Sequence, residues 1–456
     1  MRTDLDRDLA RLDELIARQE RRFHERHPVS ARLTAECGNT LVGAATSNWQ
    51  MARPGVVWID RAVGSRIYDV DGNEYSDFQC GYGVGLVGHA HPAIVEAVRR
   101  QVERGTHFAQ PTEDALVVAR ELARRFGLPA WRFCSSGTEA TLDAVHLMRA
   151  FTGRDLIVKI EGCYDGHHDS VMVSVGNPPD EIGPPDRPTN PVFGSGIPRA
   201  IADLTLVAPF NDLDALAGLF EEHRGRIAGL IMEPIMMNAG IIPPEPGYLE
   251  GVREITQAHG ALLVFDEVKT GLSVGPAGAT GLLGVTPDLV CLAKALGGGL
   301  PCAAIGGTDD VMGLIAEGTY YQIGTFNGNP LSMAAAKATL LEVLNDAAYA
   351  HIGRLAQRMA EGITATLEEQ GIPGYVLTYG AKGSITFSRT PVRNYRDFLA
   401  VEERYGHCHW AYQHNGGVFL PPWGKSEQWT ISVQHTDEDV DRFLANVAAF
   451  AADLRA

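Results

Sequence analysis

The sequence lacks a long hydrophobic run and lacks an excess of basic residues. No apolar stretch reaches the roughly 18 residues that a membrane span needs, so we expect no membrane partner. Lysine and arginine number 39 against 56 aspartate and glutamate residues, which gives a formal net charge of −17. Because a nucleic-acid-binding surface needs a basic face, this balance predicts no nucleic-acid partner, although it is compatible with a local pocket for a small anion.

Cysteine is also scarce, and clear metal or nucleotide motifs are missing. The seven cysteines are scattered and odd in number, which predicts reduced thiols and a cytoplasmic protein. The charged segment 1–28 lacks the apolar core of a signal peptide. The segments HHD (167–169) and HCH (407–409) lack the ligand spacing of a zinc site, so we expect no metal. The segment GVGLVG (83–88) matches G-x-G-x-x-G without a strand-to-helix unit around it, so we expect no dinucleotide site.

What the middle of the sequence does contain is a regular alternation of strand-like and helical stretches. Seven apolar runs are strand candidates, at residues 131–135, 155–160, 204–209, 228–234, 261–267, 288–293 and 303–307. This alternation predicts an α/β fold with a mostly parallel seven-stranded sheet between helices. We place this large domain at residues 76–340.

The two ends of the sequence predict a smaller α+β domain. Residues 1–75 contain an amphipathic helix over 3–28 and a hairpin or meander that turns at Asp71-Gly72. Residues 341–456 combine helices with short strands. The N-terminal helix is interpreted either as an arm that docks on a partner subunit or as a plain surface helix.

Two reactive side chains stand at the ends of predicted strands. Asp266 ends the run ALLVFD, and Lys294 directly follows the run DLVCLA. Ligands of open parallel sheets lie at the carboxyl ends of the strands, where a half-desolvated amine can attack a carbonyl. A buried carboxylate beside it can hold a protonated ring nitrogen, so the pair suits pyridoxal phosphate. The alternative is an ordinary buried acid and a solvated lysine.

Two turns that follow other predicted strands add to this picture. Ser136, Gly137, Thr138 and Glu139 open a helix with the Ser-x-x-Glu pattern of a capping box. The same turn points free amides and a hydroxyl at one place, which suits a phosphate. We favour the phosphate interpretation because the strand-end pair is also present. Tyr164 is placed either to stack on a flat cofactor ring or simply to pack.

Several stretches together resemble the class-III, fold-type I pyridoxal-phosphate enzymes. The likeness is strongest to glutamate-1-semialdehyde aminomutase and its aminotransferase relatives. The matching pieces are YDVDGNEYSDF, GHAHP, SSGTEAT, FTGRD, EGCYDGH, EPIMMNAGIIPPEPGYLEGVRE, FDEV, KALGGGLP and GTFNGNPLSM. They run over residues 68–338 and the likeness resumes near the C-terminus, so it covers most of the chain. This set in this order is more specific than any single motif.

The resemblance implies a pyridoxal 5'-phosphate cofactor and assigns roles to the matching positions. Lys294 resembles the lysine that forms the Schiff base, and Asp266 resembles the partner of the ring nitrogen. The other positions that resemble cofactor or substrate contacts are Ser136, Gly137 and Thr138 at the phosphate, Tyr164 on the ring, Glu233 and Asn238 behind it, Thr325 at the phosphate of the other subunit, Tyr82 in the substrate wall, and Glu427 near an acid over the substrate. The role of Thr325 implies a homodimer with shared active sites.

The sequence departs from the aminomutase pattern near the substrate. Trp49 stands where the aminomutase has an arginine that grips the substrate carboxylate, and Asp165 replaces the histidine of GCYHGH. Lys269 and Ser273 stand in DEVKTGLS, where relatives often have an uncharged residue and an arginine. The resemblance therefore implies intact cofactor machinery beside a different substrate pocket.

These observations predict an aminotransferase that acts on a small-molecule amine donor and a carbonyl acceptor through Lys294. Trp49 and Tyr82 would form an apolar wall, which suits a hydrophobic amine or a β-amino acid. Glutamate-1-semialdehyde 2,1-aminomutase is the alternative. A non-catalytic protein that keeps the cofactor fold is a third hypothesis, and the presence of both Lys294 and Asp266 argues against it.

Overall fold

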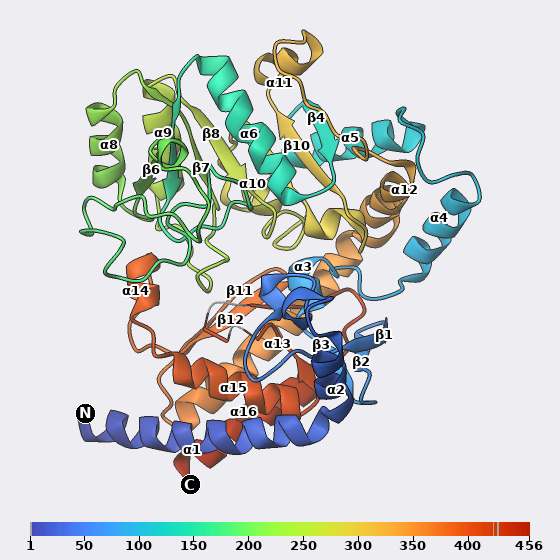
Figure 1. The fold of residues 1–456 in the computed structure, drawn as a ribbon, viewed down its shortest axis with the longest axis vertical. Coiled ribbons are helices and arrows are strands. Elements are labelled where there is room, and N and C mark those ends of the chain that lie inside the picture. Colours follow the sequence, from blue (N-terminus) through green and yellow to red (C-terminus); the bar gives the residue numbers. More distant parts are fainter. Residues whose placement is uncertain (1, 423, 426–427) are drawn as a thin grey trace.

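The seven predicted strands form one sheet in the computed structural model, which describes residues 2–422, 424–425 and 428–456 (Figure 1). In spatial order the strands are β4(Ala130–Cys134), β10(Ala303–Gly307), β9(Leu289–Leu292), β8(Leu262–Asp266), β7(Ile227–Met232), β5(Leu156–Ile160) and β6(Thr205–Ala208). From β9 to β6 all neighbours pair in parallel, whereas β10 runs antiparallel to both β4 and β9. The predicted mostly parallel α/β sheet is therefore confirmed.

Apolar side chains cover this sheet on both faces. On β8, Leu262 and Val264 belong to the core under α6 and α11, whereas Leu263 and Phe265 belong to the core on the opposite face, with α5, α8, α9 and α12. A strand that is apolar at every position is what a sheet buried on both sides requires. The helices of this lobe are α4(Pro92–Val102), α5(Glu113–Phe126), α6(Gly137–Thr152), α7(Arg199–Ala202), α8(Leu213–Glu222), α9(Tyr248–Ala258), α10(Gly278–Leu283), α11(Asp309–Ala316) and α12(Pro330–Ala338).

A smaller lobe is built from both ends of the chain (Figure 1). Its elements are β1(Ile59–Val63), β2(Arg66–Asp69), β3(Glu74–Asp77), α13(Asp346–Glu369), β11(Tyr375–Tyr379), β12(Lys382–Thr386), α15(Glu403–Asn415), β13(Val418–Phe419), β14(Trp429–Thr430) and α16(Asp437–Arg455). The predicted N-terminal meander is present as β1, β2 and β3, and C-terminal β13 pairs in parallel with β3. The predicted α+β lobe from the two termini is therefore confirmed.

The N-terminal helix is part of the smaller lobe rather than a projecting arm. Helix α1(Arg2–Arg26) lies along α15, and its Leu12 and Phe23 are buried (Figure 1). Arg18 of α1 also pairs with Asp453 of α16. The apolar side of the helix therefore faces its own chain, so the docking-arm interpretation is wrong for that side.

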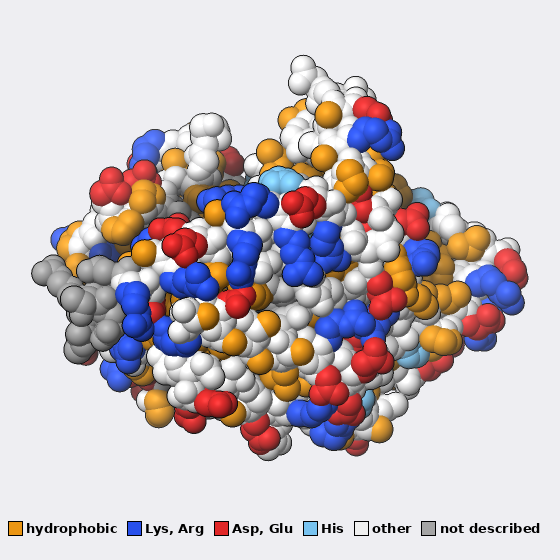
Figure 2. Space-filling view, turned by 90° about the horizontal axis from the view of Figure 1, so that it is seen from below, with side chains coloured by type: hydrophobic (Ala, Val, Ile, Leu, Met, Phe, Trp, Pro, Cys, Tyr) orange, Lys and Arg blue, Asp and Glu red, His pale blue; other side chains and the backbone are white. Residues whose placement is uncertain are grey.

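On the outer face of the molecule seen from below, basic and acidic side chains are interspersed (Figure 2).

One short helix ties the two lobes together beside the sheet. Helix α14(Tyr395–Leu399) comes from the C-terminal part of the chain, and its Arg396 binds Glu161, the residue after β5. The guanidinium makes two hydrogen bonds to the carboxylate, of 3.0 and 2.8 Å. Such a two-point pair has a defined geometry, so it fixes this part of the C-terminal lobe relative to the strand end.

The composition predicted reduced cysteines and no membrane span, and the structure has features relevant to both. All seven cysteines are free thiols, and six of them are buried. Burial raises the pKa of the Cys163 and Cys291 thiols well above the usual range, so these groups are unreactive at neutral pH. Within the described part of the chain, no helix combines the length and the apolar character that crossing a membrane requires.

Candidate active site

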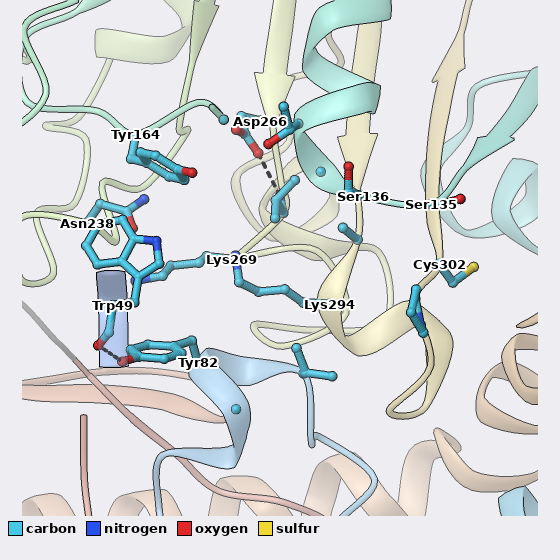
Figure 3. Close-up of a pocket in the computed structure, with 18 of the residues that line it drawn as sticks. Trp49, Tyr82, Ser135, Ser136, Tyr164, Asn238, Asp266, Lys269, Lys294 and Cys302 are labelled. Carbon is cyan, nitrogen blue, oxygen red and sulfur yellow. Dashed lines mark hydrogen bonds between the residues drawn. The ribbon is translucent and has the colours of Figure 1, made fainter. Parts of the chain in front are cut away.

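A cavity of about 440 Å³ lies between the lobes, at the carboxyl ends of β8 and β9. The larger lobe supplies most of its wall, and the N-terminal part of the chain closes the opposite side (Figure 3). Ten of the twelve predicted site residues line this cavity: Trp49, Tyr82, Ser136, Gly137, Thr138, Tyr164, Glu233, Asn238, Asp266 and Lys294. The fold therefore brings together residues that are up to 245 positions apart in the sequence.

Asp266 is the last residue of β8, a strand whose side chains are all buried. Its side chain is 4% exposed and accepts a hydrogen bond of 2.8 Å from the backbone N–H of Val268. Burial, reinforced by the nearby charge of Asp165, raises the pKa of the Asp266 carboxyl well above its usual value. A carboxylate held in so dry a place binds a cationic N–H group strongly, because water does not compete for it.

Lys294 lies two residues after the end of β9 and begins the 3₁₀ turn Lys294–Gly297. Its φ angle is 46°, in the left-handed region that residues other than glycine rarely occupy. Such a conformation costs about 1–3 kcal/mol and is found most often at functional sites. The turn directs the side chain into the cavity, with Asp266 and Tyr164 on one side and Tyr82 on the other (Figure 3).

The N-terminus of α6 forms a ready site for an anion. The Ser136 hydroxyl accepts a 3.3 Å hydrogen bond from the Glu139 N–H, and the Glu139 carboxylate accepts one of 2.8 Å from the Ser136 N–H. The predicted capping box is thus present. A Cβ atom at Gly137 would lie 2.9 Å from a methyl group of Val268, so only glycine lets the turn approach the strand end so closely. The first-turn amides and the helix dipole together favour a phosphate at this point.

Glu233 holds the two loops that carry Tyr164 and Asn238. Its carboxylate follows β7 and accepts hydrogen bonds from the N–H of Tyr164 at 3.1 Å, the N–H of Met237 at 2.6 Å and the side-chain amide of Asn238 at 2.9 Å. All three donors come from loops at the carboxyl edge of the sheet. The aromatic ring of Tyr164 is therefore held at a fixed place on the cavity wall.

Trp49 and Tyr82 form the wall that faces the larger lobe. The Tyr82 hydroxyl donates a 2.6 Å hydrogen bond to the carbonyl oxygen of Trp49. The indole of Trp49 meets the ring of Tyr164 edge-on, with centroids 5.5 Å apart and planes at 87°. Trp49 is 39% exposed, so it stands at the mouth of the cavity. There it contributes apolar area and no positive charge.

A second cavity of about 910 Å³ adjoins the first and shares Trp49, Tyr164 and Asn238 with it. Its wall includes Phe398 and Lys425, whose ammonium nitrogen lies 5.2 Å from the centre of the Phe398 ring. Burial lowers the pKa of Lys425. The active-site cavity therefore continues into a larger space that is partly aromatic and carries a cation.

The two other predicted site residues are Thr325 and Glu427. Thr325 is exposed in the loop before α12, next to Phe326, which is 62% exposed. Its contact with the phosphate of another subunit stays a prediction. Glu427 lies outside the described residues.

Two charged residues near the site had no assigned role in the sequence argument. Lys269 lines the cavity, and its ammonium group donates to the carbonyl oxygen of Met237 at 3.0 Å. Asp165 is buried behind Tyr164. Each was visible only as a departure from the family pattern, in DEVKTGLS and in EGCYDGH. The pattern gave no indication of which groups the two side chains would contact.

The cavity fits pyridoxal phosphate on its own geometry. It offers a helix N-terminus, a buried acceptor, an aromatic wall and an amine, which are the four groups that hold this cofactor. A Cβ atom at Gly166 would lie 2.7 Å from Thr141 Oγ1 and 3.1 Å from Thr138 Cα. The glycine thus lets the loop after Tyr164 pack directly on the start of α6, beside the proposed phosphate position.

Comparison with known proteins agrees with this chemistry. Residues 49–445 match the model of the family described as Aminotransferase class-III. The chain is 42% identical over 393 residues to a glutamate-1-semialdehyde 2,1-aminomutase 2 from Exiguobacterium sibiricum, and the match covers 86% of this chain and 88% of that protein.

Two solved structures are similar across nearly the whole fold. A glutamate-1-semialdehyde-aminomutase from Pseudomonas aeruginosa in complex with PMP is 33% identical with a TM-score of 0.90, covering 98% of this chain and 99% of that one. An omega-transaminase from Sphaerobacter thermophilus is 34% identical with a TM-score of 0.88, covering 94% and 98%. These neighbours confirm the predicted fold.

Proposed function

Because the chain belongs to the class-III aminotransferase family, we propose that it moves an amino group between a hydrophobic amine or β-amino acid and a keto acid or aldehyde. It is a pyridoxal-phosphate-dependent enzyme, as the family match and the PMP complex of the P. aeruginosa neighbour indicate. The observation that carries the substrate assignment is Trp49 at the cavity mouth.

Residues of the larger lobe would hold the cofactor. Gly137 and Thr138 would bind the phosphate at the start of α6, Asp266 would bind the ring nitrogen, and Tyr164 would face the ring. Lys294 would hold the aldehyde carbon until a substrate amine replaces it. When bound, pyridoxal phosphate withdraws electrons from the substrate amine and thereby acidifies its Cα–H bond.

Lys294 is the proposed base. Its amine accepts the Cα proton of the substrate and holds it for return, which is the usual contribution of a positioned general base. The position of Lys294 inside the cavity supports this role, because a base must lie within reach of the proton it takes. Asp266 acts from the opposite side by keeping a proton on the ring nitrogen.

The substrate assignment follows from what an indole can and cannot bind. A guanidinium clamps a carboxylate through two charge-assisted hydrogen bonds, whereas an indole offers one neutral donor. Each hydrogen bond to a charged group contributes about 1.5–3 kcal/mol, so the loss of the clamp weakens binding of an α-carboxylate. The aromatic wall of Trp49, Tyr82 and Tyr164 instead favours an apolar substrate. The adjoining cavity leaves room for a longer tail, with Lys425 available to an acidic group.

A second candidate is the 2,1-aminomutase reaction on glutamate 1-semialdehyde. The names of the E. sibiricum relative and the P. aeruginosa neighbour favour it. An aminomutase must retain its substrate between two half-reactions, so a weak grip on the carboxylate is doubly unfavourable. We therefore rank the aminotransferase reaction first.

We also propose a homodimer whose subunits complete each other's phosphate sites. Around Thr325, Ile323 is 85% and Phe326 62% exposed, and Phe326 contacts the ring of His107, with centroids 5.2 Å apart. Phe108, next along the chain, is 46% exposed. Grouped exposed apolar side chains of this kind mark interaction surfaces. A cytoplasmic location is proposed as well, and the free thiols support it.

The deciding experiment supplies two substrate sets to the loaded enzyme. One contains glutamate 1-semialdehyde alone, and the other contains a hydrophobic amine with a keto acid. We expect amino transfer from the amine to the keto acid and little 5-aminolevulinate. Efficient 5-aminolevulinate formation without exchange between the amine and the keto acid would overturn the assignment in favour of the aminomutase.

A further inference from the structure

A second carboxylate lies buried behind the one that faces the cofactor site. Asp165 is fully buried, and within the described residues neither of its carboxylate oxygens has a hydrogen-bond donor. Its charged neighbour is Lys159, whose ammonium nitrogen lies 3.5 Å from Asp165 Oδ2. At that distance the two groups form an ion pair rather than a hydrogen bond. An acid in this state is held by charge alone, which is unusual for a buried polar group.

Lys159 is anchored independently of Asp165. It belongs to β5, is fully buried, and donates hydrogen bonds to the carbonyl oxygens of Ile160 at 3.2 Å and Cys163 at 2.6 Å. These two bonds fix the ammonium group at the end of the strand. The lysine therefore offers Asp165 a fixed positive charge and is not free to follow it.

The charged groups that face Asp165 come from three strands. Lys159 comes from β5, Glu233 follows β7 and Asp266 ends β8. The charges of Lys159 and Glu233 shift the pKa of Asp165, and the charge of Asp165 shifts the pKa of Asp266. Glu233 is satisfied by its three hydrogen bonds to loop amides. The cluster thus holds three acids, with Lys159 acting on Asp165 and Lys294 acting on Asp266.

Burial raises the pKa of Asp165 to about 7, against the opposing pull of Lys159. The charge state of this residue therefore changes in the neutral range. When Asp165 is ionised, it adds a second negative charge near Asp266. A cation opposite Asp266 is then more stable, because an opposite charge within a few ångströms favours the charged form.

We propose that Asp165 is a positioning residue that acts through Asp266, and that the Lys159–Asp165 pair makes the hold on the protonated ring nitrogen of the cofactor depend on pH near neutrality. The inference rests on the proposed cofactor-binding role of Asp266. The histidine that stands here in the family pattern is neutral or cationic, so the substitution introduces a group that can carry a negative charge near Asp266.

The test compares the equilibrium affinity of the apo-protein for pyridoxal phosphate, and the visible absorbance of the reloaded protein, from pH 5.5 to 9. In the natural protein, the affinity for pyridoxal phosphate should rise as the pH increases through the neutral range. Asp165→Asn should lose this rise and bind about tenfold more weakly at pH 8, the equivalent of one pKa unit. Lys159→Met should instead move the rise to higher pH by about one to three units, because it removes the opposing charge.

Asp143→Asn is the matched control. Asp143 is also a buried acid whose pKa is raised by burial, but it lies on α6 and accepts hydrogen bonds from Tyr320 and Gln322. This variant should keep the natural pH dependence. Asp165→Ser, which also removes the carboxylate and does not titrate in this range, serves if Asp165→Asn does not fold, and it should also remove the rise.

The outcomes separate the two claims. If the natural protein does not bind pyridoxal phosphate, the proposed function fails. The natural protein binds the cofactor if the proposed function holds. If Asp165→Asn then keeps the natural pH dependence of the affinity, only the role of Asp165 is overturned. The same holds if Lys159→Met leaves the midpoint of the rise in affinity unchanged or moves it to lower pH. If the pair has only a structural role, both substitutions should weaken cofactor binding equally at every pH, and that result would also contradict the inference.

Discussion

The two walls of the active-site cavity are built with different degrees of constraint. On the larger-lobe wall, Asp266 and Glu233 are buried, and both are held by backbone hydrogen bonds. On the opposite wall, Tyr82 and Trp49 come from short turns near the N-terminus, and Trp49 is 39% exposed. Chemistry needs fixed groups, whereas an exposed wall tolerates replacement. With the roles proposed above, reaction type and substrate choice would be carried by separate parts of this molecule.

Removing Lys294 is the most severe test of the constrained wall. Lys294→Ala should lower turnover by about 10²–10⁴-fold, because it removes a general base that contributes a factor of that size. Borohydride reduction of the natural loaded enzyme, followed by peptide mapping, should place the label on Lys294. Lys269→Ala, a change in the same cavity, should keep that label. A label on Lys269 or Lys159 would show that the assignment of the lysine is wrong.

Restoring an arginine tests the exposed wall. Trp49→Arg should raise kcat/KM for substrates with an α-carboxylate by about 10–100-fold, the effect of one regained charged hydrogen bond of about 1.5–3 kcal/mol. It should lower kcat/KM for hydrophobic amines. Trp49→Phe is the control, since it keeps the apolar wall and should keep the preference. An unchanged preference in Trp49→Arg would mean that Trp49 only packs.

Thr325 tests whether the constrained wall extends into a second subunit. Thr325→Ala should weaken pyridoxal-phosphate affinity by about tenfold, because one hydrogen bond to a charged phosphate is lost. Thr319→Ala, an exposed threonine before the same loop, should have no effect. Sedimentation at falling concentration should show cofactor loss together with dissociation. A monomer that retains its full cofactor content would refute the shared site.

The last prediction concerns stability and pH. The pKa of Asp165 is raised to about 7 in the folded protein from an ordinary value of 3.8, so the folded state binds more protons between these values. Stability is therefore greatest at low pH within this window and falls as pH rises through 7, by at most about 1.4 kcal/mol per pH unit for one proton. Chemical denaturation of the apo-protein should show a smaller fall in Asp165→Asn. An equal fall in both proteins would contradict the shift.

The same comparison explains what the sequence could predict. The strands of the larger lobe were predictable because β7, β8 and β9 are almost entirely apolar, and the capping box at Ser136 is a local pattern. The partner of an aromatic residue is not local: Tyr82 donates to Trp49 across 33 positions. The packing of α1 against α15 could not be predicted for the same reason, because an amphipathic sequence does not specify which surface covers its apolar side.

The pairing of Lys159 with Asp165 could not be predicted for a further reason. The two residues are six positions apart, but their contact depends on the turn after β5 bringing the loop back over the strand end. Thr325 is a harder case, because the group it is proposed to contact belongs to another chain. The sequence pattern therefore located the chemistry better than it located the electrostatic environment of that chemistry.

The left-handed backbone of Lys294 carries a consequence for how this enzyme can evolve. At φ 46° the position favours glycine, yet it holds the side chain that we propose as the base. Lys294→Gly should therefore make the apo-protein more stable, by up to about 1 kcal/mol, while abolishing turnover. Selection for thermal robustness alone would drive this position away from lysine. If Lys294 has the proposed role, a lineage that lost the activity would be expected to relax here first.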